Sequence, residues 1–166
     1  MQSQWQPPQS GHVKVNVDAG LKDGLASLGI IARDAQGSVL FASSQIRFHC
    51  SDPEVAELMA LIEGLRLEIQ WTDLPVVLET ECLSICKALN SNEDNRSKLA
   101  LQLKEAKLLG DELRGVEFIH CNRMCNRVAH ELGQHACKQL CSNVWIMRAP
   151  EFVGHLVADD CNPVHI

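Results

Sequence analysis

Apolar and polar residues alternate in the first part of the chain. In VKVNVDAG, residues 13–20, three valines alternate with polar side chains, which is typical of a strand with one buried face. The segment LGIIARDAQGSVLFASSQIRF, residues 28–48, contains two apolar runs joined by Asp-Ala-Gln-Gly. Gly37 supplies the positive φ that a tight turn favours, so the segment predicts a hairpin. We therefore expect three consecutive antiparallel strands.

A helical spacing replaces this alternation after residue 50. The segment SDPEVAELMALIEGLRLEIQW opens with Ser51 or Asp52 as N-cap and with Pro53 in the first turn. Its apolar residues then recur three to four positions apart, which predicts an amphipathic helix over 51–71.

Shorter patterns complete the order of elements. PVVLET and VEFIH are typical of a fourth and a fifth strand, the latter over residues 116–120. Helices are expected over ECLSICKALNS, over RSKLALQLKEAKLLGDEL after a polar break at 92–95, and from about Asn126 to Leu140. The order β-β-β-α-β-α-α-β-α predicts a mixed α/β fold with crossover helices.

Length and composition favour one globular domain. The chain has 166 residues, of which 46% are hydrophobic, enough for a sizeable core. Residues 1–11 are polar and rich in Pro and Gln, so we expect a disordered leader before a domain over 12–157 and a C-terminal tail over 158–166. The sequence shows neither a signal peptide nor a membrane span, and we expect an intracellular monomer, nuclear or cytoplasmic.

Charge and cysteine content narrow the classes of function. The net charge of −6 gives no general attraction to a polyanion, so any nucleic acid has to be held locally. Eight cysteines in a chain without an export signal favour reduced thiols.

Three carboxylates lie at the ends of predicted elements. Asp18 ends the first predicted strand, Glu57 lies in the first turns of the long helix, and Glu81 ends the fourth strand in VVLETECLSI. Sites in open α/β sheets gather at such ends, so the three could converge. A cluster of this kind needs a cation, and oxygen ligands suit Mg²⁺ or Mn²⁺. Alternatively, the three acids merely solvate the ends of the elements.

The segments VKVNVDAG, LGIIARDAQGSVL, EVAELMALIEGL, VVLETECLSICKALN and FIHCNRMCNRVAHELG resemble, in this order and spacing, the type 1 ribonuclease H domain. They look most like its plant branch, found with retrotransposon reverse transcriptases. The resemblance covers about residues 12–157. It implies a ribonuclease H-like α/β fold, with a five-stranded mixed sheet flanked by helices.

The resemblance also implies site residues. The family's catalytic Asp, Glu and second Asp fall on Asp18, Glu57 and Glu81, and a fourth acidic position falls on His130. The family's mobile histidine falls on His120. Asp18, Glu57, Glu81 and His130 would then bind two Mg²⁺ or Mn²⁺ ions, and His120 would shuttle a proton.

The function that this resemblance implies is hydrolysis of the RNA strand of RNA/DNA hybrids by a two-metal mechanism. Glu81 and His130 replace Asp, which favours a weakened activity. One alternative is a catalytically degenerate ribonuclease H-like domain that binds nucleic acid or another partner. A second is a zinc-binding interaction module, because the C-x₃-C spacing occurs at 82/86, 121/125 and 137/141 with three histidines nearby. On a helix, that spacing is also typical of small buried packing residues.

Overall fold

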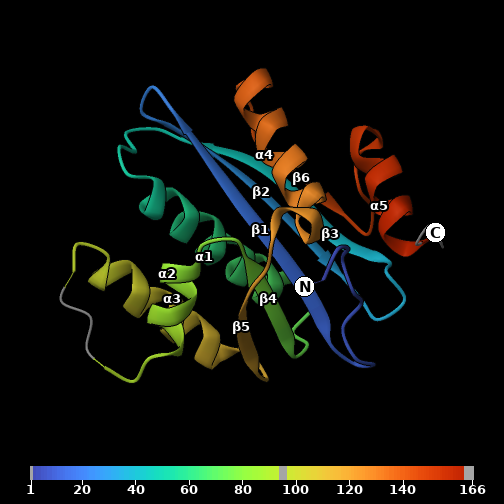
Figure 1. Ribbon diagram of the computed structural model, residues 1–166, viewed down its shortest axis with the longest axis horizontal. Helices are drawn as coiled ribbons and strands as arrows, with labels where there is room; N and C mark the ends of the chain where they lie inside the picture. Colours follow the sequence, from blue (N-terminus) through green and yellow to red (C-terminus); the bar gives the residue numbers. More distant parts are fainter. Residues whose placement is uncertain (1, 94–96, 163–166) are drawn as a thin grey trace.

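A computed structural model describes residues 2–93 and 97–162 of the chain. Its centre is a six-stranded sheet with the strand order β5-β4-β1-β2-β3-β6 (Figure 1). The strands are β1 (Val13–Lys22), β2 (Leu25–Arg33), β3 (Val39–Arg47), β4 (Val76–Thr80), β5 (Val116–His120) and β6 (Asn143–Ile146). The helices are α1 (Pro53–Trp71), α2 (Leu83–Asn90), α3 (Ala100–Glu112), α4 (Arg127–Gln139) and α5 (Gly154–Cys161), with short 3₁₀ turns at Arg123–Cys125 and Glu151–Val153.

The first nine elements follow the predicted order, but the prediction of five strands is wrong. Strands β1, β2 and β3 are antiparallel, and β4 and β5 run parallel to β1. The sixth strand, β6, pairs antiparallel with the outer edge of β3. Its four residues, two exposed and two partly buried, are too few to give an alternating pattern, so the sequence did not predict it.

Both hairpin turns depend on residues with positive φ. Asp23 and Gly24, with φ of 52° and 78°, form a two-residue connection between β1 and β2. In the predicted turn between β2 and β3, the Asp34 Oδ1 accepts hydrogen bonds from the N–H groups of Gln36 and Ser38, and Gly37 has φ 79°. The predicted hairpin is therefore confirmed.

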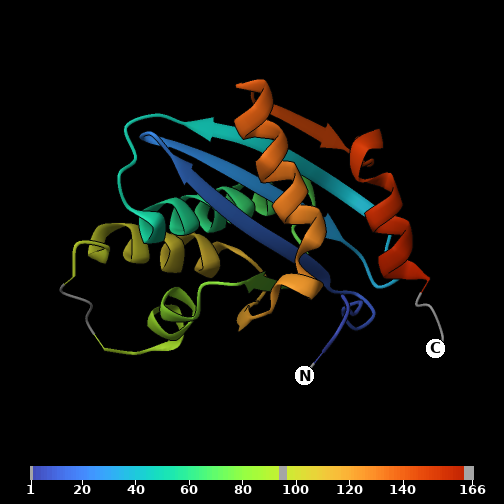
Figure 2. The ribbon, with the colours of Figure 1, turned by 45° about the horizontal axis from the view of Figure 1, so that its top comes forward.

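Helices cover both faces of the sheet. α1, α2 and α3 lie on one face, whereas α4 crosses the other and α5 lies beside α4 (Figure 2). The valines of β1 face α1, and Gly64 brings the α1 backbone close to them. On the opposite face Gly29 of β2 lies directly beneath the α4 backbone. This close approach sets where α4 presents its side chains.

The segments that flank the predicted domain make contacts with it. Residues 2–11, predicted as a disordered leader, lie against the domain, and Trp5 is only 2% exposed. Its Nε1 donates to Asn16 Oδ1 over 3.1 Å, and its ring stacks 3.9 Å from the Arg33 guanidinium. The predicted boundary at 157/158 falls inside α5, where Asp160 pairs with Arg33 over 2.8 Å. The composition of residues 1–11 indicated disorder because a single aromatic side chain, Trp5, hardly changes it, although that side chain has buried partners.

The thiols do not form one group. All eight cysteines are free; Cys50, Cys86, Cys121 and Cys125 are buried, as expected of packing residues. Cys137 is half-buried and Cys141 is exposed, so this pair does not fit that expectation. Within residues 2–93 and 97–162, none of the helices combines the length and hydropathy that a membrane span requires.

The contact between β2 and α4 gives a first prediction. An added Cβ at Gly29 would lie 1.8 Å from the Ala129 carbonyl oxygen and 2.5 Å from the Gly133 nitrogen, and neither backbone atom can rotate away. We expect Gly29→Ala to lower the free energy of unfolding by roughly 3 kcal/mol. Gly133→Ala is the matched control, because its Cβ would meet nothing closer than 3.5 Å. Denaturant unfolding of both variants measures this, and equal stabilities would contradict the packing.

Glu68, near the end of α1, gives a second prediction, which concerns the pH dependence of stability. It is fully buried, and burial, with a contribution from the charge of Asp73, raises its pKa to about 8. The folded state therefore keeps a proton that the unfolded state releases, so this group lowers stability as pH rises from 5 to 8, by at most about 1.4 kcal/mol per pH unit.

Glu68→Gln should match the wild type near pH 5 and exceed it in unfolding free energy at pH 8. The exposed Glu112→Gln should keep the wild-type pH dependence. Denaturant unfolding at a series of pH values measures both, and a Glu68→Gln curve parallel to the wild type would count against a buried neutral carboxyl.

Candidate active site

Asp18 lies at the point where β1 stops pairing with its neighbour β4. The parallel pairing of β1 with β4 stops at Val17 and Thr80, while β1 continues to Lys22 in the hairpin with β2. Asp18 therefore does not end its strand, contrary to the sequence prediction, but it sits beside the end of β4. It is 5% exposed, and its Oδ2 lies 2.9 Å from His130 Nδ1 of α4.

Glu57 reaches the same place from α1. The helix begins where the Asp52 carboxylate accepts the Glu54 N–H over 2.8 Å, with Pro53 in the first turn. Glu57 Oε1 then accepts the N–H of Ala19, the neighbour of Asp18, over 3.3 Å. Its second oxygen, Oε2, is buried and has no hydrogen-bond partner.

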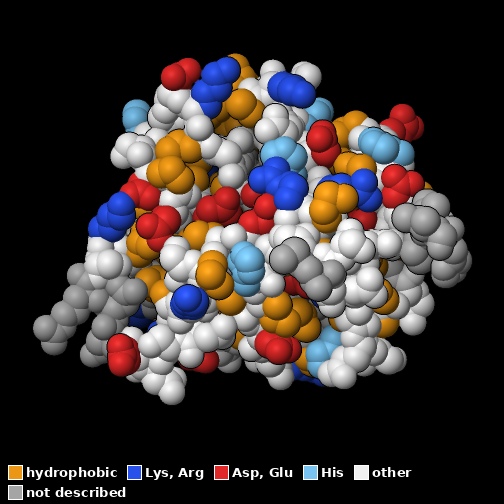
Figure 3. Space-filling view, viewed as in Figure 1, with side chains coloured by type: hydrophobic (Ala, Val, Ile, Leu, Met, Phe, Trp, Pro, Cys, Tyr) orange, Lys and Arg blue, Asp and Glu red, His pale blue; other side chains and the backbone are white. Residues whose placement is uncertain are grey.

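Glu81 follows β4 directly and is held on both oxygens. Asn126 Nδ2 donates to its Oε2 over 3.0 Å, and Arg123 Nε donates to its Oε1 over 2.9 Å. The Arg123 guanidinium also contacts the His130 ring. The structure thus brings Asp18, Glu57, Glu81 and His130 together, as the sequence predicted, around an arginine that the sequence reasoning missed. Figure 3 shows acidic, basic and histidine side chains gathered in the middle of this face.

A buried polar layer supports the cluster from below. Asn126 also donates to the carbonyl oxygen of Val17 over 3.0 Å, and its Oδ1 accepts from Asn16 Nδ2 over 3.1 Å. Asn16 donates in turn to Glu79, which forms a buried ion pair with Lys14 over 2.9 Å. The polar residues within the strand patterns VKVNVD and VVLET could have indicated this layer. Asn16 of the first strand and Glu79 of the second are direct neighbours in the sheet.

The carboxylates of the cluster repel one another, and their burial raises the pKa values of two of them, Glu57 and Asp18. Burial, reinforced by the charge of Asp18, raises the pKa of Glu57 to about 8. Burial also raises the pKa of Asp18, against the opposing effect of its hydrogen bond to His130. Near neutral pH the cluster therefore retains a proton unless a cation enters it.

The donor set fits a hard divalent cation. Three carboxylates and an imidazole suit Mg²⁺ or Mn²⁺, and the partnerless Oε2 of Glu57 is a buried oxygen that a cation would satisfy. Within the described part of the chain, however, no three His, Cys, Asp or Glu side chains are already arranged to hold a metal. The Glu81 carboxylate is instead turned toward Arg123 and Asn126. The cysteines, all of which lie in the described part of the chain, do not form a zinc-binding group with each other or with histidines.

His120 lines a different cavity from Arg123 and His130. It is the exposed last residue of β5 and lines a cavity of about 240 Å³ together with Gln2, Cys121, Asn122 and Cys125. Its role in proton transfer remains a prediction.

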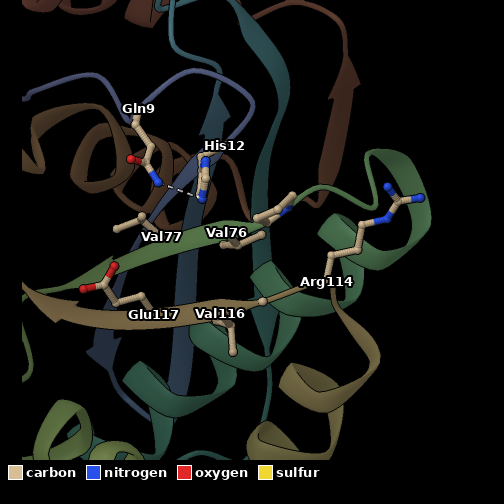
Figure 4. Close-up of a pocket in the computed structure, with 9 residues that line it drawn as sticks. Gln9, His12, Val76, Val77, Arg114, Val116 and Glu117 are labelled. Carbon is tan, nitrogen blue, oxygen red and sulfur yellow. Dashed lines mark hydrogen bonds between the residues drawn. The ribbon is translucent and has the colours of Figure 1, made fainter.

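A larger cavity, of about 560 Å³, lies at the opposite end of the sheet (Figure 4). Gln9 and His12, whose side chains are joined over 3.0 Å, face the amino-terminal ends of β4 and β5 there. Glu117 is the one carboxylate among its lining residues, all of which are described. The chemistry therefore concentrates at the carboxyl end of β4.

Solved structures with a similar fold include two ribonucleases H1. The enzyme from the halophilic archaeon Halobacterium salinarum NRC-1 is 19% identical, with a TM-score of 0.72 over 78% of this chain and 99% of its own. The LC11 ribonuclease H1, isolated from compost by a metagenomic approach, is 23% identical, with a TM-score of 0.69 over 79% of this chain and 99% of its own. LC11 has also been solved in complex with an RNA/DNA hybrid (23% identity, TM-score 0.67, covering 78% and 99% of the chains).

These similarities establish a ribonuclease H-like α/β fold. No match was found among curated proteins. The sequence profile described as reverse transcriptase-like matches residues 16–136, which include Asp18, Glu57, Glu81 and His130. The chain therefore belongs to the reverse transcriptase-like family.

Proposed function

We propose that this protein hydrolyses the RNA strand of RNA/DNA hybrids. The observation that carries the proposal is the convergence of Asp18, Glu57, Glu81 and His130 at the end of β4, with a buried Glu57 oxygen that lacks a partner. The fold supports it, because a protein of the same fold, the LC11 ribonuclease H1, binds such a hybrid. The segment NRVAHEL around His130 further supports the plant retrotransposon-associated branch.

Asp18, Glu57, Glu81 and His130 would hold two Mg²⁺ or Mn²⁺ ions. When bound, such ions supply an activated water and stabilise the leaving 3′ oxygen. Asn126 keeps the Glu81 carboxylate oriented by donating to it from a buried position. Arg123, which is half exposed beside the acids, is placed to donate to the non-bridging oxygens of a scissile phosphate, and His120 is the proposed proton shuttle.

Two residues favour Mn²⁺ over Mg²⁺ at this site. Glu81 is one methylene longer than the Asp of the family pattern, and Mg²⁺ tolerates displaced oxygens poorly. Imidazole, the ligand that His130 would contribute, is also better suited to Mn²⁺ than to Mg²⁺. The proposed activity is therefore a weakened one.

A second candidate function is nucleic-acid binding without cleavage. Arg123 favours it, because its guanidinium already neutralises Glu81 and contacts His130, where a cation is needed. Hybrid binding with no cleavage in either metal would select this function. Both candidates take a nucleic acid as partner and need neither a membrane nor a second subunit.

The decisive measurement is cleavage of a labelled RNA/DNA hybrid with Mg²⁺ and with Mn²⁺. Asp18→Asn should reduce the rate by roughly 100-fold or more, because Asp18 is the central charge of the site. Asp73→Asn is the matched control, since this exposed acid lies at the other end of the sheet. Cleavage that survives Asp18→Asn would refute the catalytic assignment.

The metal preference gives a separate prediction. Activity should be higher in Mn²⁺ than in Mg²⁺, and His130→Asp should raise the Mg²⁺ rate relative to the Mn²⁺ rate by replacing an imidazole with a hard oxygen ligand. Rates in both metals, before and after the substitution, measure this ratio. An unchanged ratio would mean that His130 does not bind the metal.

A further inference from the structure

A cavity of about 260 Å³ adjoins the acidic cluster on its α4 side. It lies between the start of α4 and the side of α5, and it shares Arg123 and His130 with the cluster. Its lining residues are Arg123, Met124, Arg127, His130, Glu131 and Leu156. We refer to it as the α4–α5 pocket.

The pocket contains an arginine, Arg127, whose counter-ion is shared with a second arginine. The carboxylate of Asp160, 5% exposed, lies 2.8 Å from Arg33 and 3.5 Å from Arg127. One carboxylate faces two guanidinium groups, so Arg127 shares its counter-ion with Arg33, and Glu131 is the one carboxylate among the residues that line the pocket. Arg33 is completely enclosed, whereas the Arg127 side chain is 31% exposed, so of these two guanidinium groups it is Arg127 that an anion can reach.

The Arg127 guanidinium is only loosely held within the protein. Its Nε is buried and has no hydrogen-bond partner, and its link to Asp160 through Nη2 is long. Arg127 is in addition the first residue of the 13-residue helix α4. The Asn126 side chain does not cap this helix, because it is committed to Val17 and Glu81. The dipole of α4 therefore adds to the positive potential at this end of the helix.

We propose that the α4–α5 pocket binds a backbone phosphate of the polynucleotide, adjacent to the phosphate in the acidic site. The proposal rests on the proposed function and adds a second anchor to it. A planar guanidinium is well suited to phosphate oxygens, and the volume admits a phosphate with part of its sugar. With a net charge of −6 the chain needs such a local anchor. Glu131, exposed at the rim, opposes the anion and so weakens this anchor.

The test is binding of a fluorescently labelled RNA/DNA hybrid, followed by anisotropy in EDTA at several salt concentrations. Because EDTA prevents cleavage, the measurement reports binding alone. Arg127→Gln should weaken binding roughly tenfold. It should also reduce the slope of log affinity against log salt by about one. Arg127→Lys should retain most of the salt slope. Arg114→Gln, at the opposite end of the sheet, is the control for a lost charge and should change neither quantity appreciably.

Glu131→Gln tests the pocket in the opposite direction. Removing the opposing carboxylate should tighten hybrid binding several-fold. Glu112→Gln removes an equal charge from an exposed position on α3 and should leave the affinity nearly unchanged. Because Glu131 is exposed, this variant decides the matter even where Arg127→Gln disturbs folding through Asp160.

The outcomes separate the two proposals. A wild-type protein that neither binds the hybrid in EDTA at low salt nor cleaves it with Mg²⁺ or Mn²⁺ overturns both. If the wild type binds, but Arg127→Gln and Glu131→Gln behave like their controls, the pocket proposal fails and the proposed function stands. Opposite shifts in the two variants, absent from Arg114→Gln and Glu112→Gln, establish the phosphate anchor.

Discussion

Repulsion among carboxylates that share a small buried volume governs the region around Asp18. Each neighbour reduces it: the Ala19 N–H and the Asn126 amide donate to Glu57 and Glu81, and Arg123 brings a full positive charge. The repulsion that these neighbours leave raises the pKa of Glu57, so this carboxyl keeps its proton and the negative charge of the cluster is lower. The position of α4 is part of the same solution, since it carries His130 to Asp18.

The sequence predicted the elements whose local pattern is strong. Alternating valines indicated β1, and helical spacing with an N-cap indicated α1, because both patterns reflect burial on one face. Asp18, Glu57 and Glu81 were grouped by their places at the ends of predicted elements, resemblance to a family added His130, and the structure brings all four together. Their convergence could not come from periodicity, because it depends on where β4 stops beside β1.

The features that were missed depend on contacts between distant residues. Arg123 looked like an ordinary polar residue in a loop, and its contacts with Glu81 and His130 exist only once β4 and α4 are in place. Trp5 lies in a segment whose composition indicated disorder. Its side chain is held by Asn16 and Arg33, which in the sequence look like ordinary polar positions of two strands. The same holds for the layer of Lys14, Asn16 and Glu79. Such buried polar groups are costly unless every partner is present, which makes them specific to one arrangement.

Arg33 links the assembly of the domain to the order in which the chain is made. It lies in β2, yet one of its partners is Trp5 and its counter-ion is Asp160. During synthesis from the amino terminus, the first hairpin emerges long before residue 160 does. Until then, burying Arg33 would leave an uncompensated charge inside the protein, which is strongly unfavourable. The β2 face that later lies under α4 and α5 should therefore stay hydrated on the ribosome, and its closure becomes a late step of folding.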